Sequence, residues 1–119
     1  MTADIFNPAE IERKIADVSN RIAQGVNLAD EKYRAFLDAD RLYDAAFARA
    51  YMAYSGPAHA KRYAAELETT EEREARDVAD AAYRYTDRRT RAYQDELRSL
   101  QSINKSVLMA YQTAGVGER

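Results

Sequence analysis

The sequence predicts an all-α fold, a long antiparallel helical hairpin or coiled coil, on three observations. The 119 residues contain 4 Gly and 2 Pro, too few for the turns of a many-stranded sheet. Alanine, arginine and glutamate, which favour helices, recur along the chain. Apolar residues return at alternating steps of three and four, which puts them on one helix face. A three-helix arrangement with a short middle helix is the alternative, and the length suits a single helical domain over residues 1–119.

The first predicted helix has a specific start signal. Asn7 is a favourable cap, and Pro8 suits the first helical position because its missing N–H has no partner there. Glu10 would complete a capping box. Phe6 and Ile11 are spaced as a hydrophobic staple on either side of the cap. These residues predict that the helix begins at Pro8.

An apolar seam predicts that this first helix continues over residues 8–54. The seam contains Ile11, Ile15, Val18, Ile22, Val26, Ala29, Tyr33, Phe36, Asp40, Tyr43, Phe47, Ala50 and Tyr54. The extra step of four between Ile22 and Val26 is read as a stutter in the heptad pattern. Gly25 is the weak point, and Asn27 offers a cap for a new start. Because the seam resumes after this point, we expect a continuous or merely bent helix.

The segment Ser55-Gly56-Pro57 is the predicted turn, in which Gly ends one helix and Pro begins the next. Residues 58–113 contain no Gly or Pro and are predicted to form one helix or two. Their seam contains Ala60, Ala64, Leu67, Ala75, Val78, Ala82, Tyr85, Ala92, Leu97, Leu100, Asn104, Val107 and Tyr111. Thr69 and Thr70, followed by two acids, resemble an interior capping box and favour a short break there. The tail 115–119 is expected to fray.

The predicted apolar faces are wider than one partner helix can cover. A two-helix hairpin buries one stripe on each helix, so further apolar side chains would stay in water. We therefore expect a homodimer or the capture of a partner helix, with a compact three-helix core within one chain as the alternative. The predicted partner and self-association face consists of Tyr33, Phe36, Tyr43, Phe47, Tyr54, Tyr85, Leu97, Leu100, Val107 and Tyr111.

The residues that usually carry catalysis are scarce. The chain has no Cys and a single His, His59, which has no second His or Cys with which to share a metal. Phosphate-binding glycine loops and nucleophile motifs are missing from the sequence. The sequence therefore predicts no catalytic residue, no metal site and no cofactor. With no signal-peptide pattern and no membrane-spanning run, the expected location is the cytoplasm.

A basic stripe gives an alternative reading as a nucleic-acid interface. Arg84, Arg88, Arg91 and Arg98 fall on one side of a helix among tyrosines, a pattern suited to single-stranded DNA. The competing expectation is that these arginines pair with the acidic run from Glu66 to Asp80, and we favour it because neighbouring acids offset much of the positive charge. Arg89 and Asp40 both lie in apolar seams, where an ion pair between them would fix the register.

Five short stretches in the second half of the chain have a distinctive composition. They are Ala-Lys-Arg at 60–62, Thr-Thr-Glu-Glu-Arg-Glu-Ala at 69–75, Asp-Val-Ala-Asp-Ala-Ala-Tyr at 77–83, Arg-Arg-Thr-Arg-Ala at 88–92 and Leu-Gln-Ser-Ile-Asn-Lys-Ser-Val at 100–107. In these stretches the chain resembles small helical proteins encoded by bacteriophages of high-GC actinobacteria. The resemblance implies a phage origin and a non-catalytic accessory role, because such reading frames lie among early genes for DNA metabolism and recombination.

The predicted turn reads Tyr54-Ser55-Gly56, and a Tyr83-x-x-x-Asp87 pair follows in the second helix. In these residues the chain resembles secreted helical hairpins whose turn carries Trp-x-Gly. The chain lacks Trp, and the Tyr/Asp pair lies in mid-helix, so the phage resemblance ranks first. The sequence thus predicts a phage-like interaction protein that dimerises and binds a host or phage protein. An accessory protein that contacts single-stranded DNA is the second hypothesis.

Overall fold

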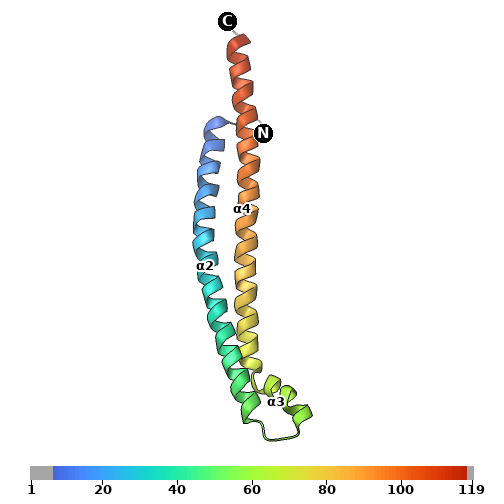
Figure 1. Ribbon diagram of the computed structural model, residues 1–119. Helices are drawn as coiled ribbons and strands as arrows, with labels where there is room; N and C mark the ends of the chain where they lie inside the picture. Colours follow the sequence, from blue (N-terminus) through green and yellow to red (C-terminus); the bar gives the residue numbers. More distant parts are fainter. Residues whose placement is uncertain (1–6, 118–119) are drawn as a thin grey trace. The chain divides into compact units, whose positions relative to one another are not determined.

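The computed structural model describes residues 7–117, and their regular structure is entirely helical (Figure 1). The elements are α2 (Pro8–Ala53), the 3-10 helix η1 (Ala58–Ala60), α3 (Lys61–Glu68) and α4 (Thr70–Gly117). The predicted all-α class is confirmed, and α3 is the short middle helix of the predicted alternative. No helix within the described residues carries an apolar stretch long enough to cross a bilayer.

The chain divides into two compact units, and long helices contribute to both. Unit 1 combines Met1–Val26 with Asp87–Arg119, and unit 2 is Asn27–Thr86. In unit 1, Gly25 faces Thr90 and the guanidinium of Arg21 lies over the ring of Tyr93. As the residue numbers increase along α2, the numbers of the residues that they contact on α4 decrease. The two helices therefore run antiparallel in unit 1.

Unit 2 has the same antiparallel pairing of α2 and α4. The rings of Tyr33 and Tyr83 lie 5.1 Å apart between centroids, and Asp40 lies beside Arg76 at 3.9 Å. Unit 2 also contains η1 and α3, which connect the end of α2 to the start of α4. A hairpin with a short middle helix is thus the architecture of this unit.

The start of α2 follows the sequence prediction. The backbone N–H of Ala9 donates to Oδ1 of Asn7 at 2.9 Å, and the N–H of Ile11 donates to the Asn7 carbonyl at 3.0 Å. Ile11 is buried. The carboxylate of Glu10, which was predicted to complete a capping box, instead lies 3.8 Å from Nη2 of Arg13. Phe6, the other half of the predicted staple, lies outside the described residues.

Helix α2 continues through Gly25, but the predicted stutter is wrong. Gly25 is half-buried, whereas Val26 is 54% exposed. From Ile11 onward, the less exposed positions of α2 in unit 1 are Ile11, Ile15, Val18, Ile22 and Gly25, an uninterrupted alternation of four and three. The predicted seam included only residues with a side chain, so it contained Val26 and not Gly25. Gly25 takes the inner position because a Cβ there would lie 3.3 Å from Cβ and Cγ2 of Thr90.

The predicted seam of α4 is also wrong over its first half. Val78 and Tyr85 are 64% and 60% exposed. The less exposed positions that continue the three-four alternation are Thr69, Glu72, Arg76, Ala79, Tyr83 and Thr86 in unit 2, and Thr90, Tyr93, Leu97, Leu100, Asn104 and Val107 in unit 1. Five of these are threonine, glutamate or arginine, in the region where the predicted seam consists mainly of alanines and valine. From Leu97 to Val107 the predicted and observed seams coincide, whereas the next predicted position, Tyr111, is 61% exposed.

The link between α2 and α3 differs from the predicted turn. Helix α2 ends at Ala53, and Gly56 does not take the left-handed conformation of a helix-ending glycine. Gly56 instead makes room for the side chain of Tyr54, because a Cβ at position 56 would lie 2.6 Å from Cζ of that ring. Pro57 has φ −58° and precedes η1, and its carbonyl accepts the N–H of Ala60 at 3.1 Å.

The predicted break at Thr69 and Thr70 is present, but the two threonines do not form the hydrogen bonds of a capping box. Thr69 has φ −110° and ψ 25° and separates α3 from α4. Its hydroxyl donates back to the Ala65 carbonyl at 2.7 Å, and the Thr70 hydroxyl donates to the Leu67 carbonyl at 2.9 Å. The threonines thus satisfy the carbonyl end of α3 instead of capping the N–H end of α4. Thr69 is almost fully buried.

Candidate interaction surface

An aromatic cluster between α2 and α4 contains several residues of the predicted interaction face. Tyr33 contacts Tyr83 of α4 and lies 6.4 Å from Phe36 between ring centroids. Further along α2, Tyr43 and Phe47 lie 6.1 Å apart. Tilted ring pairs at these separations are favourable packing arrangements. These predicted residues therefore already have partners within unit 2.

Arg76 is a cation within the inner seam of unit 2. Its guanidinium lies 4.6 Å from the ring centroid of Tyr43 and 3.9 Å from Oδ1 of Asp40, and it also reaches Asp77 at 3.2 Å. Its side chain is 29% exposed, so solvent screens these contacts less than those of a surface arginine. Asp40, which the sequence suggested as a partner of Arg89, pairs with Arg76. Arg76 was missed because the seam was traced through apolar residues alone.

The other predicted face residues have different degrees of exposure. Tyr54 in unit 2 is half-buried. In unit 1, Leu97, Leu100 and Val107 are half-buried on the inner face of α4, and Tyr111 is exposed. Tyr85 of unit 2 is exposed too. Most of the predicted set thus packs within a unit. Tyr33 is 43% exposed although it contacts Tyr83, and Tyr85 and Tyr111 reach the surface.

Three of the four arginines of the basic stripe have carboxylate partners within α4. Nε of Arg84 donates to Oδ1 and Oδ2 of Asp80 at 3.0 and 3.1 Å. Arg91 lies 3.0 Å from Asp87, and Arg98 lies 2.6 Å from Asp95. Asp80 belongs to the acidic run from Glu66 to Asp80, so the first pair agrees with the prediction. Asp87 and Asp95 lie outside that run. Within residues 7–117, Arg88 has no ion pair.

Tyr93 in unit 1 lies between two arginines that the sequence analysis did not connect with it. Nε of Arg89 donates to its hydroxyl at 3.0 Å, and the guanidinium carbons of Arg89 and Arg21 lie 5.6 and 5.8 Å from the ring centroid. The bond from Arg89 stabilises the phenolate most and lowers the pKa of Tyr93, with a smaller contribution from Arg21. The four-residue spacing of Arg89 and Tyr93 is the sequence signal that would have found this pair.

The surface of α4 in unit 2 carries an apolar stripe that α2 does not cover. The outer stripe consists of Ala75, Val78, Ala82 and Tyr85, at steps of three, four and three. Val78 and Tyr85 have more than half of their area exposed. These are the residues that the sequence analysis assigned to the buried seam. They form a second coiled-coil type of face beside the inner seam.

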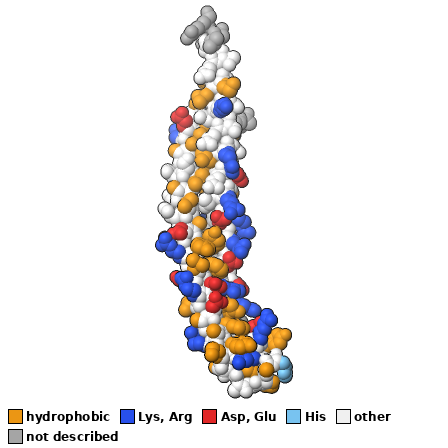
Figure 2. Space-filling view, in the orientation of Figure 1, with side chains coloured by type: hydrophobic (Ala, Val, Ile, Leu, Met, Phe, Trp, Pro, Cys, Tyr) orange, Lys and Arg blue, Asp and Glu red, His pale blue; other side chains and the backbone are white. Residues whose placement is uncertain are grey.

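A second exposed apolar group lies at the α3 end of unit 2. Met52 at the end of α2 is 81% exposed, and Tyr63 and Leu67 lie one turn apart on the outside of α3. Figure 2 shows apolar side chains gathered at this end, among basic ones. The ammonium of Lys61 lies 4.7 Å from the ring centroid of Tyr51. His59, in η1, is exposed.

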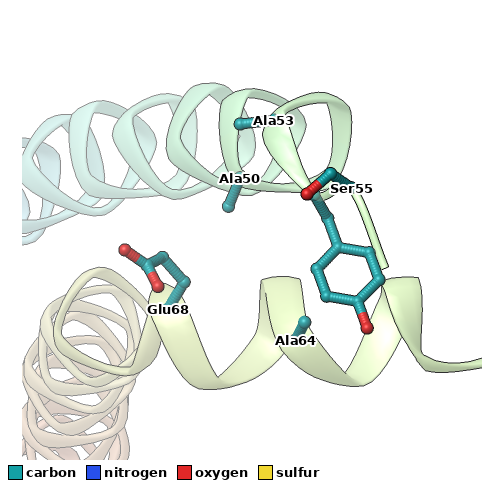
Figure 3. A pocket seen from close by; sticks show the side chains of 6 residues that line it. Ala50, Ala53, Ser55, Ala64 and Glu68 are labelled. Atoms are coloured by element: carbon teal, nitrogen blue, oxygen red, sulfur yellow. The ribbon is translucent and has the colours of Figure 1, made fainter. Parts of the chain in front are cut away.

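A shallow hollow lies beside the link in unit 2 (Figure 3). Its volume is about 300 Å³, and it is lined by Ala50, Ala53, Tyr54, Ser55, Ala64 and Glu68. Three alanines leave the space between the end of α2 and α3 unfilled. The hollow is open to solvent, and Glu68 is its one charged lining group. Within residues 7–117, His, Asp and Glu side chains do not gather in threes as metal ligands.

Comparison of the chain with known protein families, with curated proteins and with solved structures finds no match.

Proposed function

We propose that this chain is a non-catalytic helical interaction protein that forms a homodimer and binds a host or phage protein in the bacterial cytoplasm. The observation that carries the proposal is the outer stripe of α4, with Val78 and Tyr85 exposed. Exposed apolar side chains that line up on one helix face are typical of protein–protein contact sites. The phage-type partner follows from the resemblance of residues 58–111.

The polar character of the inner seam gives a second reason for self-association. Glu72, Arg76 and Thr86 occupy inner positions of α4 in unit 2, where a coiled coil usually has apolar side chains. Apolar burial contributes about 25 cal/mol per Å². The contact of this seam with α2 therefore stabilises the fold less than the contact of an apolar seam would. Covering the outer stripe with another helix adds apolar burial that the single chain lacks.

The basic stripe gives less support to the alternative of single-stranded DNA binding. Each phosphate contact by Arg84, Arg91 or Arg98 competes with a carboxylate one turn away. Counterion release for four contacts would give a slope of about −3 in log affinity against log salt. Fluorescence anisotropy with a labelled single strand measures that slope. We expect no binding at physiological salt for the wild type.

Light scattering together with circular dichroism tests the proposal on the full chain. We expect strong helical ellipticity and a mass twice the 13.5 kDa of one chain. A helical monomer at micromolar concentration would refute self-association. Single-strand affinity that is lost on replacing Arg84, Arg88, Arg91 and Arg98 by Ala, while the dimer stays intact, would favour the DNA-binding alternative.

A further inference from the structure

We propose that the second copy of the chain is the occupant of the outer stripe, with the two α4 helices antiparallel. This inference rests on the proposed function and gives its dimer a specific geometry. The steps of three, four and three among Ala75, Val78, Ala82 and Tyr85 are those of a coiled-coil seam. Since α2 packs against another side of α4 in unit 2, the stripe is open to a second helix.

The side-chain sizes along the outer stripe define a register. A two-fold axis midway between Val78 and Ala82 sets Tyr85 opposite Ala75 of the second copy and Val78 opposite Ala82 of the second copy. Each large side chain then meets an alanine, so the two surfaces interdigitate. Because the axis makes the contact self-complementary, one stripe supplies both halves of the interface.

Two charged residues beside the stripe select the antiparallel direction. Glu74 and Arg88 are exposed, flank the stripe on one side of α4, and have no ion pair within residues 7–117. In the antiparallel register, Glu74 lies beside Arg88 of the second copy, and the symmetric pair forms on the other side of the axis. In a parallel dimer, the two-fold axis places this flank of the two copies on opposite sides of the interface, so Glu74 and Arg88 would not pair. Charge complementarity therefore favours a second copy in the antiparallel orientation.

Cysteine cross-linking tests the geometry directly, because the native chain has no Cys. Ala81 is exposed and lies on the line from Glu74 to Arg88, near the proposed axis. We expect A81C to give a covalent dimer in high yield with a short bis-maleimide. The matched control is A92C, also at an exposed alanine of α4. In the antiparallel register the two copies of position 92 are about 36 Å apart along the helix axis, so it should not cross-link.

The cross-linking outcomes separate this geometry from the proposed function. Efficient linkage of both variants would indicate a parallel dimer and overturn the antiparallel register. Linkage of neither variant, while light scattering still gives a dimer, would overturn the outer stripe as the interface and leave self-association standing. A monomeric wild type would refute both. Unchanged circular dichroism of A81C and A92C shows that each variant folds.

Charge exchange gives an independent test of the Glu74 and Arg88 contact. E74R and R88E each replace two attractive pairs by two repulsive ones, so each should raise the dimer dissociation constant by about tenfold. The double variant E74R/R88E restores both pairs with opposite polarity and should recover most of the wild-type affinity. If the double variant dissociates as readily as the single variants, these residues do not meet across the dimer.

Discussion

Gly25 lies directly against Thr90, with no room for a Cβ between α2 and α4 in unit 1. A methyl group at position 25 would lie 3.3 Å from Cβ and Cγ2 of Thr90, which is itself buried. In an isolated helix, Ala is more favourable than Gly by about 1 kcal/mol. Here the close approach of the two helices outweighs that preference.

Replacing Gly25 by Ala should therefore destabilise the protein, by about 1–3 kcal/mol, the usual cost of overpacking. Chemical denaturation followed by circular dichroism measures the change. Gly115→Ala is the matched control, because Gly115 is helical and a Cβ there would meet nothing within 4 Å. That variant should be neutral or slightly more stable. Equal stabilisation by both substitutions would show that the contact at Thr90 does not constrain position 25.

Arg76 should contribute to stability although it lies in the inner seam. Arg76→Ala removes the contact with the Tyr43 ring and the ion pair with Asp40, and we expect a loss of about 1 kcal/mol. Arg76→Lys keeps the charge without the planar guanidinium, so its stability should lie between those of the wild type and Arg76→Ala. Arg73→Ala, at an exposed position of the same helix, serves as the control. Comparable losses at both positions would argue against a specific role for Arg76.

The buried hydroxyl of Thr69 should stabilise the junction of α3 and α4. Thr69→Val preserves the shape of the side chain but loses the 2.7 Å bond to the Ala65 carbonyl, which should cost about 1 kcal/mol. Thr70→Val removes a similar bond at an exposed site, where water replaces the hydroxyl, so its effect should be smaller. Thermal unfolding of the two variants ranks them. The reverse order would contradict the role given to Thr69.

Tyr93 should ionise below the ordinary tyrosine value of 10.0, because Arg89 stabilises its phenolate. A folded-state pKa that is lowered for an acid adds stability above the unfolded value and loses it as pH falls through the folded value. The stability of the wild type relative to Tyr93→Phe should therefore increase as pH rises towards 10.0. Arg89→Ala should return the pKa towards 10.0 in an absorbance titration. A pH-independent difference would contradict this.

Much of the fold follows from local sequence signals. Asn7 and Pro8 predict the start of α2, and the threonine pair predicts the break before α4. The inner seam of α4 was not predictable from apolar periodicity, because Glu72 and Arg76 occupy inner positions. Their burial depends on partners supplied by α2, such as Tyr43, that a single-helix pattern cannot reveal.

Only part of the candidate surface was predictable, again because a single-helix pattern does not reveal which stripe α2 covers. Tyr85 was identified as an interaction residue, whereas Val78 was assigned to the hairpin seam, and both are exposed. One helix carries two adjacent stripes with coiled-coil spacing, and the sequence does not state which of them faces α2. Tertiary contacts such as that of Tyr33 with Tyr83 identify the inner stripe.

Sedimentation equilibrium of the wild type and of the variant Val78→Ser/Tyr85→Ser tests the outer stripe most directly. We expect the wild type to sediment with twice the mass of the 13.5 kDa chain, and the variant to sediment as a helical monomer. Leu42→Ser, at an exposed position of α2 outside the stripe, should remain dimeric. A wild-type chain that sediments at 13.5 kDa over the whole micromolar range would contradict the proposal that this protein works through helix–helix association.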